Sequence, residues 1–526
     1  MSRTIYFDIN SALKVADWRQ NAGWPIALAE THRCNRAGWK AFWPLVRSRE
    51  RWQRDILLLA GSRIVWQCLA LGEFASAAQE AAKCELEIAG APPAIDYLMN
   101  ASALDPTPPE LAPTPFKDLK PTSFAGLRRV VRSATLSAPA AWPRMLIAPD
   151  AMALSYNPVM HDYARAHGLA VKFVHADDIM LAAQSRFTAE TATPNWVGDT
   201  AVELAEAMLG ERALDASYRS RLVQLSESFI KSQLRQAANT SAALRQLPQL
   251  PKNIWIGGQL SARYVAMEAR RRGASVTGFE HGWGLACEDA AELTAYAELA
   301  IVDRFVAMTQ ISAERLKTSA AHRIASPEEA ITFIGGDGDA GARRLRLDRK
   351  KKANGSAKPT VIYAPTIVAG FRQFLPPLMP DVVHLDWQFR LCENLMRLPI
   401  NFTCRPHPEG VFRNRPHPLH AVLSPSNKKF EDLMDDADVF VFDFQQSTTF
   451  GRALCSDRGI VLIDLGTPAF DARTVAELQK RCYVIKARFD RVNRPFIDED
   501  ELREAVFAAA EEPVDASYFR DLMLGD

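Results

Sequence analysis

The sequence predicts an α/β protein with two doubly wound parallel sheets of Rossmann type facing a cleft, and an extra α-rich region at the N-terminus. The length of 526 residues supports several domains, because a single hydrophobic core stops growing at roughly 250 to 300 residues. Strand and helix patterns also alternate in two separate sets, residues 124–342 and 359–526. Such alternation is typical of parallel sheets with helical crossovers.

In the first set, short apolar runs predict strands, and helices are predicted at 158–167 and 261–272. The predicted strands of the first set are residues 145–148, 170–174, 253–256, 275–279, 299–302, 305–308 and 331–334. The second set repeats the pattern and ends in a helix near 501–510. Its predicted strands are residues 360–363, 400–403, 439–442 and 460–463.

The N-terminal region, residues 1–123, combines a predicted strand at 4–8 with long helical patterns. Its most apolar stretch, residues 56–72, is interrupted by Arg63 and Gln67, so it predicts a buried helix or strand pair rather than a transmembrane span. Eight prolines between residues 91 and 123 predict an extended linker at the end of the region.

A basic bridge, residues 343–358, separates the two α/β sets and carries eight Lys and Arg residues. Such a run predicts a solvated linker. The alternative is an electrostatic contact with anionic lipid or an anionic polymer, which would make the protein peripheral at the inner face of the cell membrane.

The overall composition bears on two questions: whether the protein binds nucleic acid, and in which cellular compartment it works. Lys and Arg number 63 against 62 Asp and Glu, a formal net charge of +1, so no nucleic-acid partner is predicted. The eight cysteines show no C-x-x-C pair and no zinc spacing, as expected of reduced thiols. The first residues lack the apolar stretch of a signal peptide. These features predict a cytoplasmic protein.

Two polar segments each follow a predicted strand of the second set, at the sheet edge where α/β proteins hold ligands. In the first, the cation Arg405 precedes His407, whose ring direction two flanking prolines would fix. In the second, Ser447, Thr448 and Thr449 lead into a helix, whose N-terminus attracts anions. Together the segments predict a phosphate pocket. The alternatives are that Ser447 only caps the helix and that His407 is an ordinary loop residue.

A third polar segment, residues 280–284, directly follows the predicted strand 275–279 of the first set. It places His281 at a carboxyl strand end, beside Gly282 and Gly284, which would leave the backbone open to a ligand. A histidine with a near-neutral pKa in a cleft suits a general base. A structural histidine in a glycine-rich turn is the alternative.

Two other motifs carry little functional weight. Residues 336–341 match G-x-G-x-x-G after a strand, but no acidic residue follows about 20 positions later, so a dinucleotide site is not favoured. The acidic run 498–501 opens a predicted helix, where carboxylates favour the helix dipole rather than a metal.

Short motifs within residues 253–464 resemble, in order, those of the CDP-glycerol glycerophosphotransferase family. They also resemble those of related bacterial capsule-type transferases of the GT-B fold, including Kdo and sialic acid transferases that use CMP-sugars. The motifs are His281-Gly282, Tyr363-Ala364-Pro365-Thr366, Arg405-Pro406-His407-Pro408, and Asp443 with Ser447-Thr448.

The resemblance implies a transferase that moves a sugar or polyol phosphate from a CMP- or CDP-linked donor to a hydroxyl of a surface glycan. It implies that His281 is the base on the acceptor hydroxyl, with Glu280 and Gly282 on the acceptor side. His407 joins His281 as a catalytic residue. The donor phosphate would be held by Arg405, Pro408, Thr366, Ser447, Thr448 and Thr449, with no metal and no cofactor.

The chain departs from the family pattern in two places. The usual Asp-Tyr-Ser-Ser is replaced by residues 443–448, Asp-Phe-Gln-Gln-Ser-Thr, which shifts the hydroxyls. A basic residue that usually follows Ala-Pro-Thr closely is here Arg372. Alternative functions are a UDP-sugar transferase or 2-epimerase of the same architecture, and a non-catalytic glycan- or nucleotide-binding protein of an assembly complex.

Overall fold

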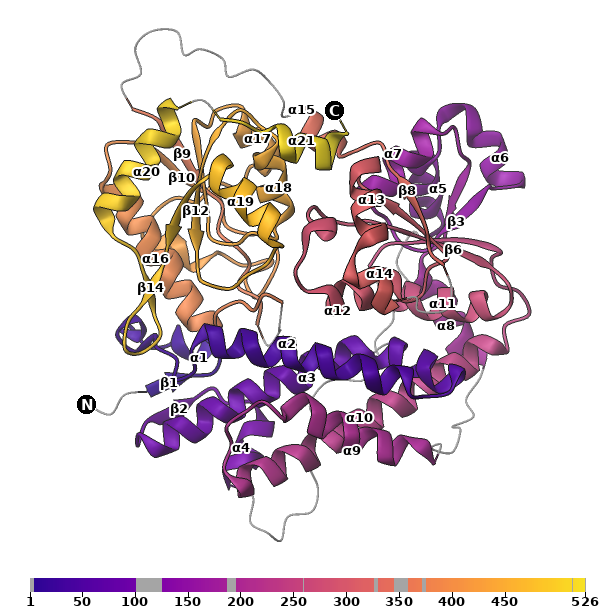
Figure 1. Cartoon of the computed structure of the whole chain (residues 1–526), viewed down its shortest axis with the longest axis horizontal. Helices are drawn as coiled ribbons and strands as arrows, with labels where there is room; N and C mark the ends of the chain where they lie inside the picture. The colour runs from indigo at the N-terminus through magenta and orange to yellow at the C-terminus, as the bar shows by residue number, and fades with distance from the viewer. Residues whose placement is uncertain are drawn as a thin grey trace.

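Two parallel sheets dominate the computed structural model, which describes residues 4–100, 125–186, 195–258, 260–325, 330–344, 358–370, 375–512 and 514–525 (Figure 1). The six-stranded first sheet contains β3 (Ala151–Ala153), β4 (Val171–Phe173), β5 (Asn253–Ile256), β6 (Ser275–Phe279), β7 (Arg304–Ala307) and β8 (Thr332–Gly335). The five-stranded second sheet contains β9 (Thr360–Tyr363), β10 (Asn401–Cys404), β11 (Val439–Phe442), β12 (Gly459–Asp464) and β13 (Tyr483–Lys486). The prediction of two Rossmann-type domains is therefore confirmed.

The strand order gives each sheet one point where the connection reverses direction. The orders are β4-β3-β5-β6-β7-β8 and β10-β9-β11-β12-β13, with every neighbouring pair parallel. The reversals fall between β3 and β5 and between β9 and β11. Ligands of open α/β sheets bind in the crevice outside the carboxyl ends at such a point, so each domain offers one defined position for a ligand.

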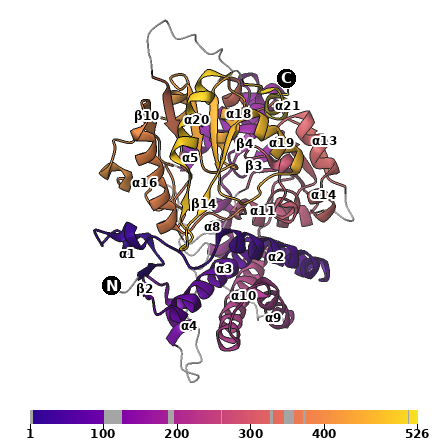
Figure 2. The same ribbon diagram turned by 60° about the vertical axis from the view of Figure 1, so that its left-hand side comes forward.

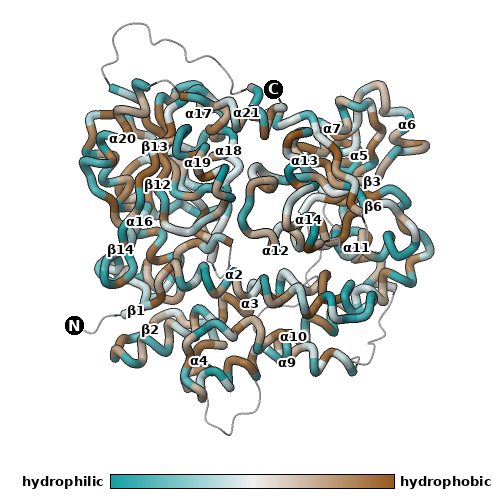
Figure 3. Tube along the Cα trace, viewed as in Figure 1, coloured by the Kyte–Doolittle hydropathy of each residue, from teal (hydrophilic) through white to brown (hydrophobic). Residues whose placement is uncertain are grey.

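Both sheets are buried on both faces, and one core runs through both domains. Ile254 and Ile256 of β5 belong to the core on one face of the first sheet, whereas Trp255 between them belongs to the core on the other face. The core that includes Trp255 also includes Phe440 of β11, while Val441 faces a third core. The strands of both sheets are among the most hydrophobic parts of the chain (Figure 3). The two domains thus share an apolar interface.

Helices cover both sheets. In the first domain they are α5 (Ala125–Leu136), α6 (Trp142–Ile147), α7 (Pro158–Ala166), α8 (Ala176–Arg186), α11 (Leu260–Arg271), α12 (Ala291–Thr294), the π-helical turn η4 (Ala295–Leu299), α13 (Gln310–Thr318), α14 (Ala320–Ala325) and α15 (Ala340–Arg344). In the second domain they are α16 (Asp381–Arg397), α17 (Phe430–Met434), α18 (Thr448–Leu454), α19 (Ala472–Arg481), α20 (Glu499–Glu511) and α21 (Ser517–Leu524).

A helical layer lies below both domains in Figures 1 and 2. Its long members α2 and α3 come from the N-terminal region, but α9 and α10 are inserted in the chain between β4 and β5, and α10 packs on α3. The layer therefore combines residues from both sides of the predicted boundary at residue 123. The helices are α2 (Leu28–Arg47), α3 (Arg51–Lys83), α4 (Pro93–Asn100), α9 (Trp196–Leu209) and α10 (Ala216–Arg245).

Within the described residues, α3 is the helix that is long and apolar enough to cross a membrane. Its most apolar window is 72% buried inside the structure, under α2, α9 and α10. The stretch 56–72 is part of α3, so the predicted buried helix is confirmed and the strand pair is not.

Segments from both ends of the described chain connect the domains. Near the start, Arg19 forms an ion pair with Glu393 on α16 of the second domain, with 2.7 Å between Nη1 and Oε1. Near the end, α21 packs on α18 and also reaches the first domain. There the Leu522 carbonyl accepts hydrogen bonds from the hydroxyls of Thr309, at 3.0 Å, and Ser312, at 2.9 Å. Each domain is thus held by a segment distant in sequence.

Two strand predictions are wrong. Residues 145–148 belong mostly to the helix α6, and the strand follows at Ala151–Ala153. Pro143 stands in the first turn of α6, where its fixed φ suits a helix start. Residues 299–302 form the end of η4 and a buried loop rather than a strand. Short apolar runs do not distinguish a strand from the buried end of a helix.

Most of the proline-rich linker and the basic bridge lies outside the described residues.

Candidate active site between the two sheets

His281 lies at the carboxyl end of β6, next to the reversal point of the first sheet. A Cβ atom on Gly258, which follows β5, would stand 3.8 Å from the His281 ring. The backbone here is fixed by Asn157 in the loop after β3, whose Nδ2 donates to the carbonyl of Glu280 at 3.1 Å. His281 therefore lies at a carboxyl strand end next to the reversal point, the position predicted for it, and its role there stays a prediction.

The His281 ring pairs with a buried carboxylate. Its Nδ1 lies 2.7 Å from Oε1 of Glu298, whose side chain is 3% exposed, whereas the His281 side chain is 58% exposed. The charge and hydrogen bonding of Glu298 raise the pKa of His281 to about 9. A carboxylate on one ring nitrogen fixes the ring and leaves Nε2 as the nitrogen that can exchange a proton with a ligand.

Glu298 is positioned by the π-helical turn η4, which is tied to the helical layer. The Tyr296 hydroxyl donates to the Leu58 carbonyl at 2.8 Å and accepts from the Ser62 amide at 2.7 Å, so it is inserted into the hydrogen-bond ladder of α3. Arg263 on α11 donates to the carbonyl of Tyr296 at 3.0 Å and lies 4.6 Å from the centre of its ring. These contacts hold the turn that carries Glu298.

Two further carboxyl groups lie near His281, and burial raises the pKa of both. Glu280 is buried and accepts a hydrogen bond from the Met308 amide at 2.6 Å, and its pKa is raised to about 8. Its carboxyl group thus faces the domain interior rather than an acceptor. The pKa of Glu288 is raised to about 7, although Thr294 donates a hydrogen bond to it at 2.6 Å. Burial therefore favours the uncharged form of both carboxyl groups more than in water.

The loop that carries His281 also forms the contact with the second domain. Gln446 donates to Oε1 of Glu288 at 3.1 Å, and a Cβ atom on Gly282 would stand 3.9 Å from the Thr448 hydroxyl. Segments after β6 and β11 therefore meet directly. The segment that brings a general-base candidate in one domain thus touches the hydroxyl-rich turn of the other.

Trp283 packs at this contact and stabilises it. Its ring packs on Phe450 and against Gly451 of α18, where an added Cβ atom would lie 2.1 Å from the ring. Gly284 has φ +86° and would place a Cβ atom 2.9 Å from Phe470. This glycine serves backbone conformation and domain packing. The expectation that Gly284 opens the backbone to a ligand is therefore not supported, whereas the space beside Gly282 fits that role.

In the second domain, Asp443 directly follows β11, at the reversal point between β9 and β11. It is buried and accepts hydrogen bonds from the Tyr363 hydroxyl at 2.5 Å, the Trp387 indole at 3.1 Å and the Thr366 amide at 3.2 Å. These donors satisfy the carboxylate and join the loops that follow the two strands. Thr366 is itself buried, so its predicted contact with a donor phosphate is not supported by an exposed side chain.

Ser447 is the N-cap of α18. Its Oγ accepts a hydrogen bond from the Phe450 amide at 3.1 Å and lies 3.1 Å from the Thr449 hydroxyl. The capping interpretation is thus correct for Ser447. Because α18 has only seven residues, its dipole is a weak source of positive potential. Thr448 is exposed, and its hydroxyl is the one of this turn that Gly282 approaches.

Arg405 and His407 follow β10, which is separated from β11 by β9. Neighbouring strands lie about 4.8 Å apart, so these residues start roughly 10 Å from the Ser447 turn. Arg405 is half-buried and donates to the Lys428 carbonyl at 3.2 Å. Although β10 and β11 are consecutive in the chain, the segments that follow them therefore do not converge on one phosphate. Pro408, which follows His407, is exposed.

His407 is held in one neutral form. Burial and the nearby Arg405 lower its pKa. The Glu409 amide donates to its Nδ1 at 3.1 Å, which requires an unprotonated Nδ1 and leaves the proton on Nε2. His407 is therefore a hydrogen-bond donor at neutral pH rather than a source of positive charge.

The remaining motifs are structural. Asp339 of the G-x-G-x-x-G match pairs with Arg452 of α18, with 2.9 Å between Nε and Oδ2. Gly341 leaves room for the same guanidinium, so this segment joins the domains and shows no dinucleotide geometry. Asp498 caps α20, as the sequence suggested. Within the described ranges, no group of three or more His, Cys, Asp and Glu side chains has metal-binding geometry.

Sequence reasoning missed Glu298, Glu288 and Gln446. Glu298 lies 17 positions after His281 on a separate turn, and its run of alanines and glutamates reads as an ordinary helix. Gln446 was treated only as part of an insertion in a family motif. A carboxylate within an otherwise apolar stretch is the signal that could have drawn attention to Glu298, because buried carboxylates require partners.

No family model matches the chain, and no curated protein matches it. Among solved structures, it matches one described as "Crystal Structure Analysis of the Glycotransferase of kitacinnamycin". The identity is 16%, the TM-score is 0.34, and the match covers 71% of this chain and 93% of the other. A likeness this distant assigns no residue and no substrate.

Proposed function

We propose that this protein is a GT-B-type transferase that moves a sugar or polyol phosphate from a cytidine-nucleotide donor to a hydroxyl of a surface glycan. The observation that carries the proposal is the contact between the loops that follow β6 and β11, where Gln446 bonds Glu288 and Gly282 approaches Thr448. A group-transfer enzyme needs acceptor-activating and donor-binding groups to meet, and this contact supports that arrangement.

His281 would remove the proton from the acceptor hydroxyl through Nε2, while Glu298 holds the ring and stabilises the imidazolium that forms. In the free protein the pKa of about 9 keeps most of His281 protonated at neutral pH. The rate of transfer should therefore increase with pH up to about pH 9. A buried carboxylate partner makes the histidine a stronger base, but it also leaves only a small fraction of His281 in the neutral, proton-accepting form at neutral pH.

The donor phosphate would lie outside the β9/β11 crevice, where Thr448 and Thr449 supply hydroxyls. Arg405 would supply a permanent positive charge, and His407 a hydrogen bond from Nε2. Since these two groups start two strands from the Ser447 turn, they fit two successive groups of a nucleotide donor better than one shared oxygen. Such donors would stabilise the leaving phosphate as charge develops on it.

The choice of cytidine rests on the motif resemblance, and the same geometry accommodates other nucleotides. Calorimetric titration with CMP, CDP, UDP and GDP should show the tightest binding for a cytidine nucleotide. Arg405→Ala should weaken this binding by about 10- to 150-fold, because charge-assisted contacts contribute about 1.5 to 3 kcal/mol. Tightest binding of UDP would favour the UDP-sugar enzymes, and no nucleotide binding would reject the proposal.

A second experiment separates a catalyst from a binding protein. His281→Ala should lower the transfer rate by about 10² to 10⁴ while nucleotide affinity stays nearly constant, since a base acts on the acceptor. His167→Ala, at an exposed histidine of the same domain, is the matched control. Full turnover by His281→Ala would refute the proposed mechanism.

A further inference from the structure

A cluster of large apolar side chains is exposed on α5 and α6, at the outer edge of the first domain. Figure 1 shows α6 far from both the second domain and the helical layer. The exposed fractions range from 47% to 86%. The cluster, named here the α5–α6 face, consists of Leu127, Val130, Val131, Trp142, Leu146 and Ile147. Exposed apolar residues are common singly, whereas a cluster of them marks an interaction site.

The α5–α6 face is one continuous surface. On α5, Leu127, Val130 and Val131 occupy positions i, i+3 and i+4, so they share one side of the helix. Ala134 extends this stripe by one more turn. The Trp142 indole donates a hydrogen bond to the Ala134 carbonyl at 3.1 Å, which joins the start of α6 to the end of the stripe. The apolar residues of the two helices therefore lie side by side.

Serines on the other side of α5 fix its orientation. The Oγ atoms of the buried Ser133 and Ser137 accept hydrogen bonds from the amides of Phe173 and Val171, each at 2.8 Å. Because β4 is an edge strand of the first sheet, these bonds satisfy amides that have no neighbouring strand. α5 thus turns its stripe of Leu and Val away from the sheet, whereas an ordinary surface helix turns such a stripe inward. Packing within the described residues does not account for this stripe.

The charges of the α5–α6 face are positive. Residues 125–149 contain four Arg and no Asp or Glu. Two of these arginines pair with carboxylates of neighbouring segments, Arg129 with Asp178 at 2.9 Å and Arg144 with Asp150 at 3.4 Å. Arg132 is exposed, lies 5.1 Å from the centre of the Phe173 ring, and forms no ion pair among the described residues. Apolar contacts would therefore provide most of the binding at this face, with a smaller contribution from charge.

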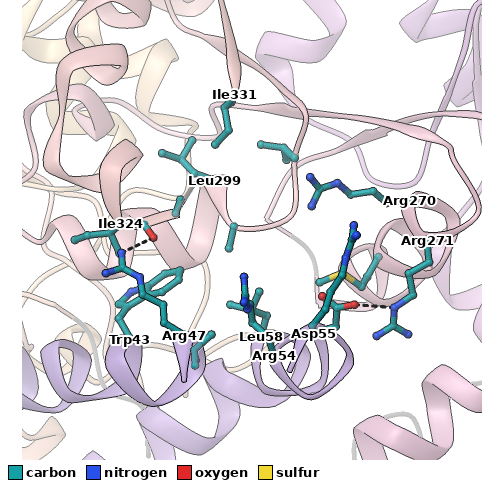
Figure 4. Close-up of a pocket in the computed structure, with 16 residues that line it drawn as sticks. Trp43, Arg47, Arg54, Asp55, Leu58, Arg270, Arg271, Leu299, Ile324 and Ile331 are labelled. Carbon is teal, nitrogen blue, oxygen red and sulfur yellow. Dashed lines mark hydrogen bonds and ion pairs between the residues drawn. The ribbon is translucent and has the colours of Figure 1, made fainter. Parts of the chain in front are cut away.

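The arginines in the cavity between the helical layer and the first domain differ, because they are paired within the chain (Figure 4). Nε of Arg270 lies 2.7 Å from Oδ1 of Asp303. Arg271 pairs with Asp55 at 2.8 Å and with Glu268 at 3.1 Å. These ion pairs hold α11 to α3 and to the residue before β7, so they belong to the packing between the layers. No segment of the described residues covers the α5–α6 face in this way.

We propose that the α5–α6 face docks on the surface of a membrane that contains anionic lipids. Its Leu, Val and Ile side chains would enter the boundary between headgroups and acyl chains, and guanidinium groups beside them would contact lipid phosphates. Tryptophan is typical of this boundary, and the Trp142 N–H group is already bonded. A second copy of the chain fits less well, because it would bring two positive segments together. The inference involves neither the basic bridge nor the proposed transferase activity.

Flotation of the full chain with vesicles tests the proposal. Vesicles of phosphatidylcholine and phosphatidylglycerol should bind the wild-type protein, and pure phosphatidylcholine vesicles should bind it more weakly. Ile147→Gln should weaken binding to the mixed vesicles about tenfold, because an apolar side chain no longer enters the boundary. Ile311→Gln, at an exposed isoleucine of α13 in the same domain, is the matched control and should bind as the wild type does. No vesicle binding by the wild type, or equal loss in both variants, would overturn the proposal.

Arg132 variants measure the contribution of charge. Arg132→Gln should weaken binding to the mixed vesicles about fivefold, since one charge near an anionic surface contributes about 1 kcal/mol. This difference should shrink at higher salt. Arg132→Lys keeps the charge and should bind as the wild type does. Equal binding of the wild type to mixed and to pure phosphatidylcholine vesicles would refute the choice of anionic lipid.

Cysteine labelling tests whether the face is open before a membrane binds. Ile147→Cys is made in a Cys84→Ser background, because Cys84 is exposed and the other seven cysteines are buried. A water-soluble maleimide should label the new thiol in solution, and the mixed vesicles should protect it. Ile311→Cys in the same background should be labelled equally with and without vesicles. Slow labelling of Ile147→Cys without vesicles would show that the protein itself covers the face, and would reject the proposal.

Discussion

Replacing Glu298 by Gln tests the pairing that defines the candidate base. The carboxylate is the main reason that the pKa of His281 is raised from 6.5 to about 9. A difference of this size corresponds to about 3.4 kcal/mol at 1.36 kcal/mol per unit. Because 58% of the His281 side chain is exposed, water screens the pair, and we expect Glu298→Gln to remove only about 1 to 2 kcal/mol.

The direct assay is NMR titration of the His281 imidazole, which needs no substrate. In the wild-type protein the midpoint should lie near pH 9. In Glu298→Gln it should fall by about 0.7 to 1.5 units, as 1 to 2 kcal/mol corresponds to that shift. Glu292→Gln, on the adjacent helix α12, is the matched control and should leave the midpoint unchanged. Titration of wild-type His281 near pH 6.5 would refute the reasoning.

The free energy of unfolding should also depend on the protonation of His281, and it should fall as the pH rises. Because the folded state has the higher pKa, the pairing stabilises the fold fully below about pH 6.5 and loses this contribution as pH rises through about 9. The destabilisation by Glu298→Gln, measured by urea unfolding, should therefore be largest near pH 6 and smaller near pH 9.5. A destabilisation that does not change with pH would contradict the proposed charge pairing.

Three other predictions concern the contacts around the site. Tyr296→Phe leaves the Ser62 amide without its acceptor and should lower the free energy of unfolding by about 1 to 3 kcal/mol, measured by urea titration. Gly451→Ala places a methyl group against Trp283 and should cost about 1 to 3 kcal/mol or more, seen as a lower Tm. Because the pKa of His407 is lowered, its ring should stay neutral between pH 7 and pH 8. Its titration should therefore not change nucleotide affinity in this range, which calorimetry at pH 7 and at pH 8 checks.

The strands that carry the site could be predicted because they are buried on both faces. β11 is a continuous apolar run, and β6, although it contains Ser275 and Thr277, is buried along almost its whole length; polar residues directly follow both strands. This pattern placed His281 and Ser447 at carboxyl strand ends correctly. The helix α6 was misjudged because its apolar run, Met145 to Ile147, is as short as a strand.

The arrangement of the strands could not be predicted from their order in the chain. The segments after β10 and β11 are neighbours in sequence, but β9 lies between the two strands. The inferred convergence of Arg405 and Ser447 on one phosphate depended on that adjacency. Glu298 was missed for a related reason, since only the folded turn η4 brings it to His281.

Two contacts made by segments near the ends of the chain hold distant parts of the molecule together. The ion pair of Arg19 with Glu393 anchors one end, and the bonds of Leu522 with Ser312 anchor the other. Separation of the two domains would have to break one of these contacts or carry both segments with it. Residues far from His281 and Thr448 in the chain thus help to keep the two loops that carry them in contact.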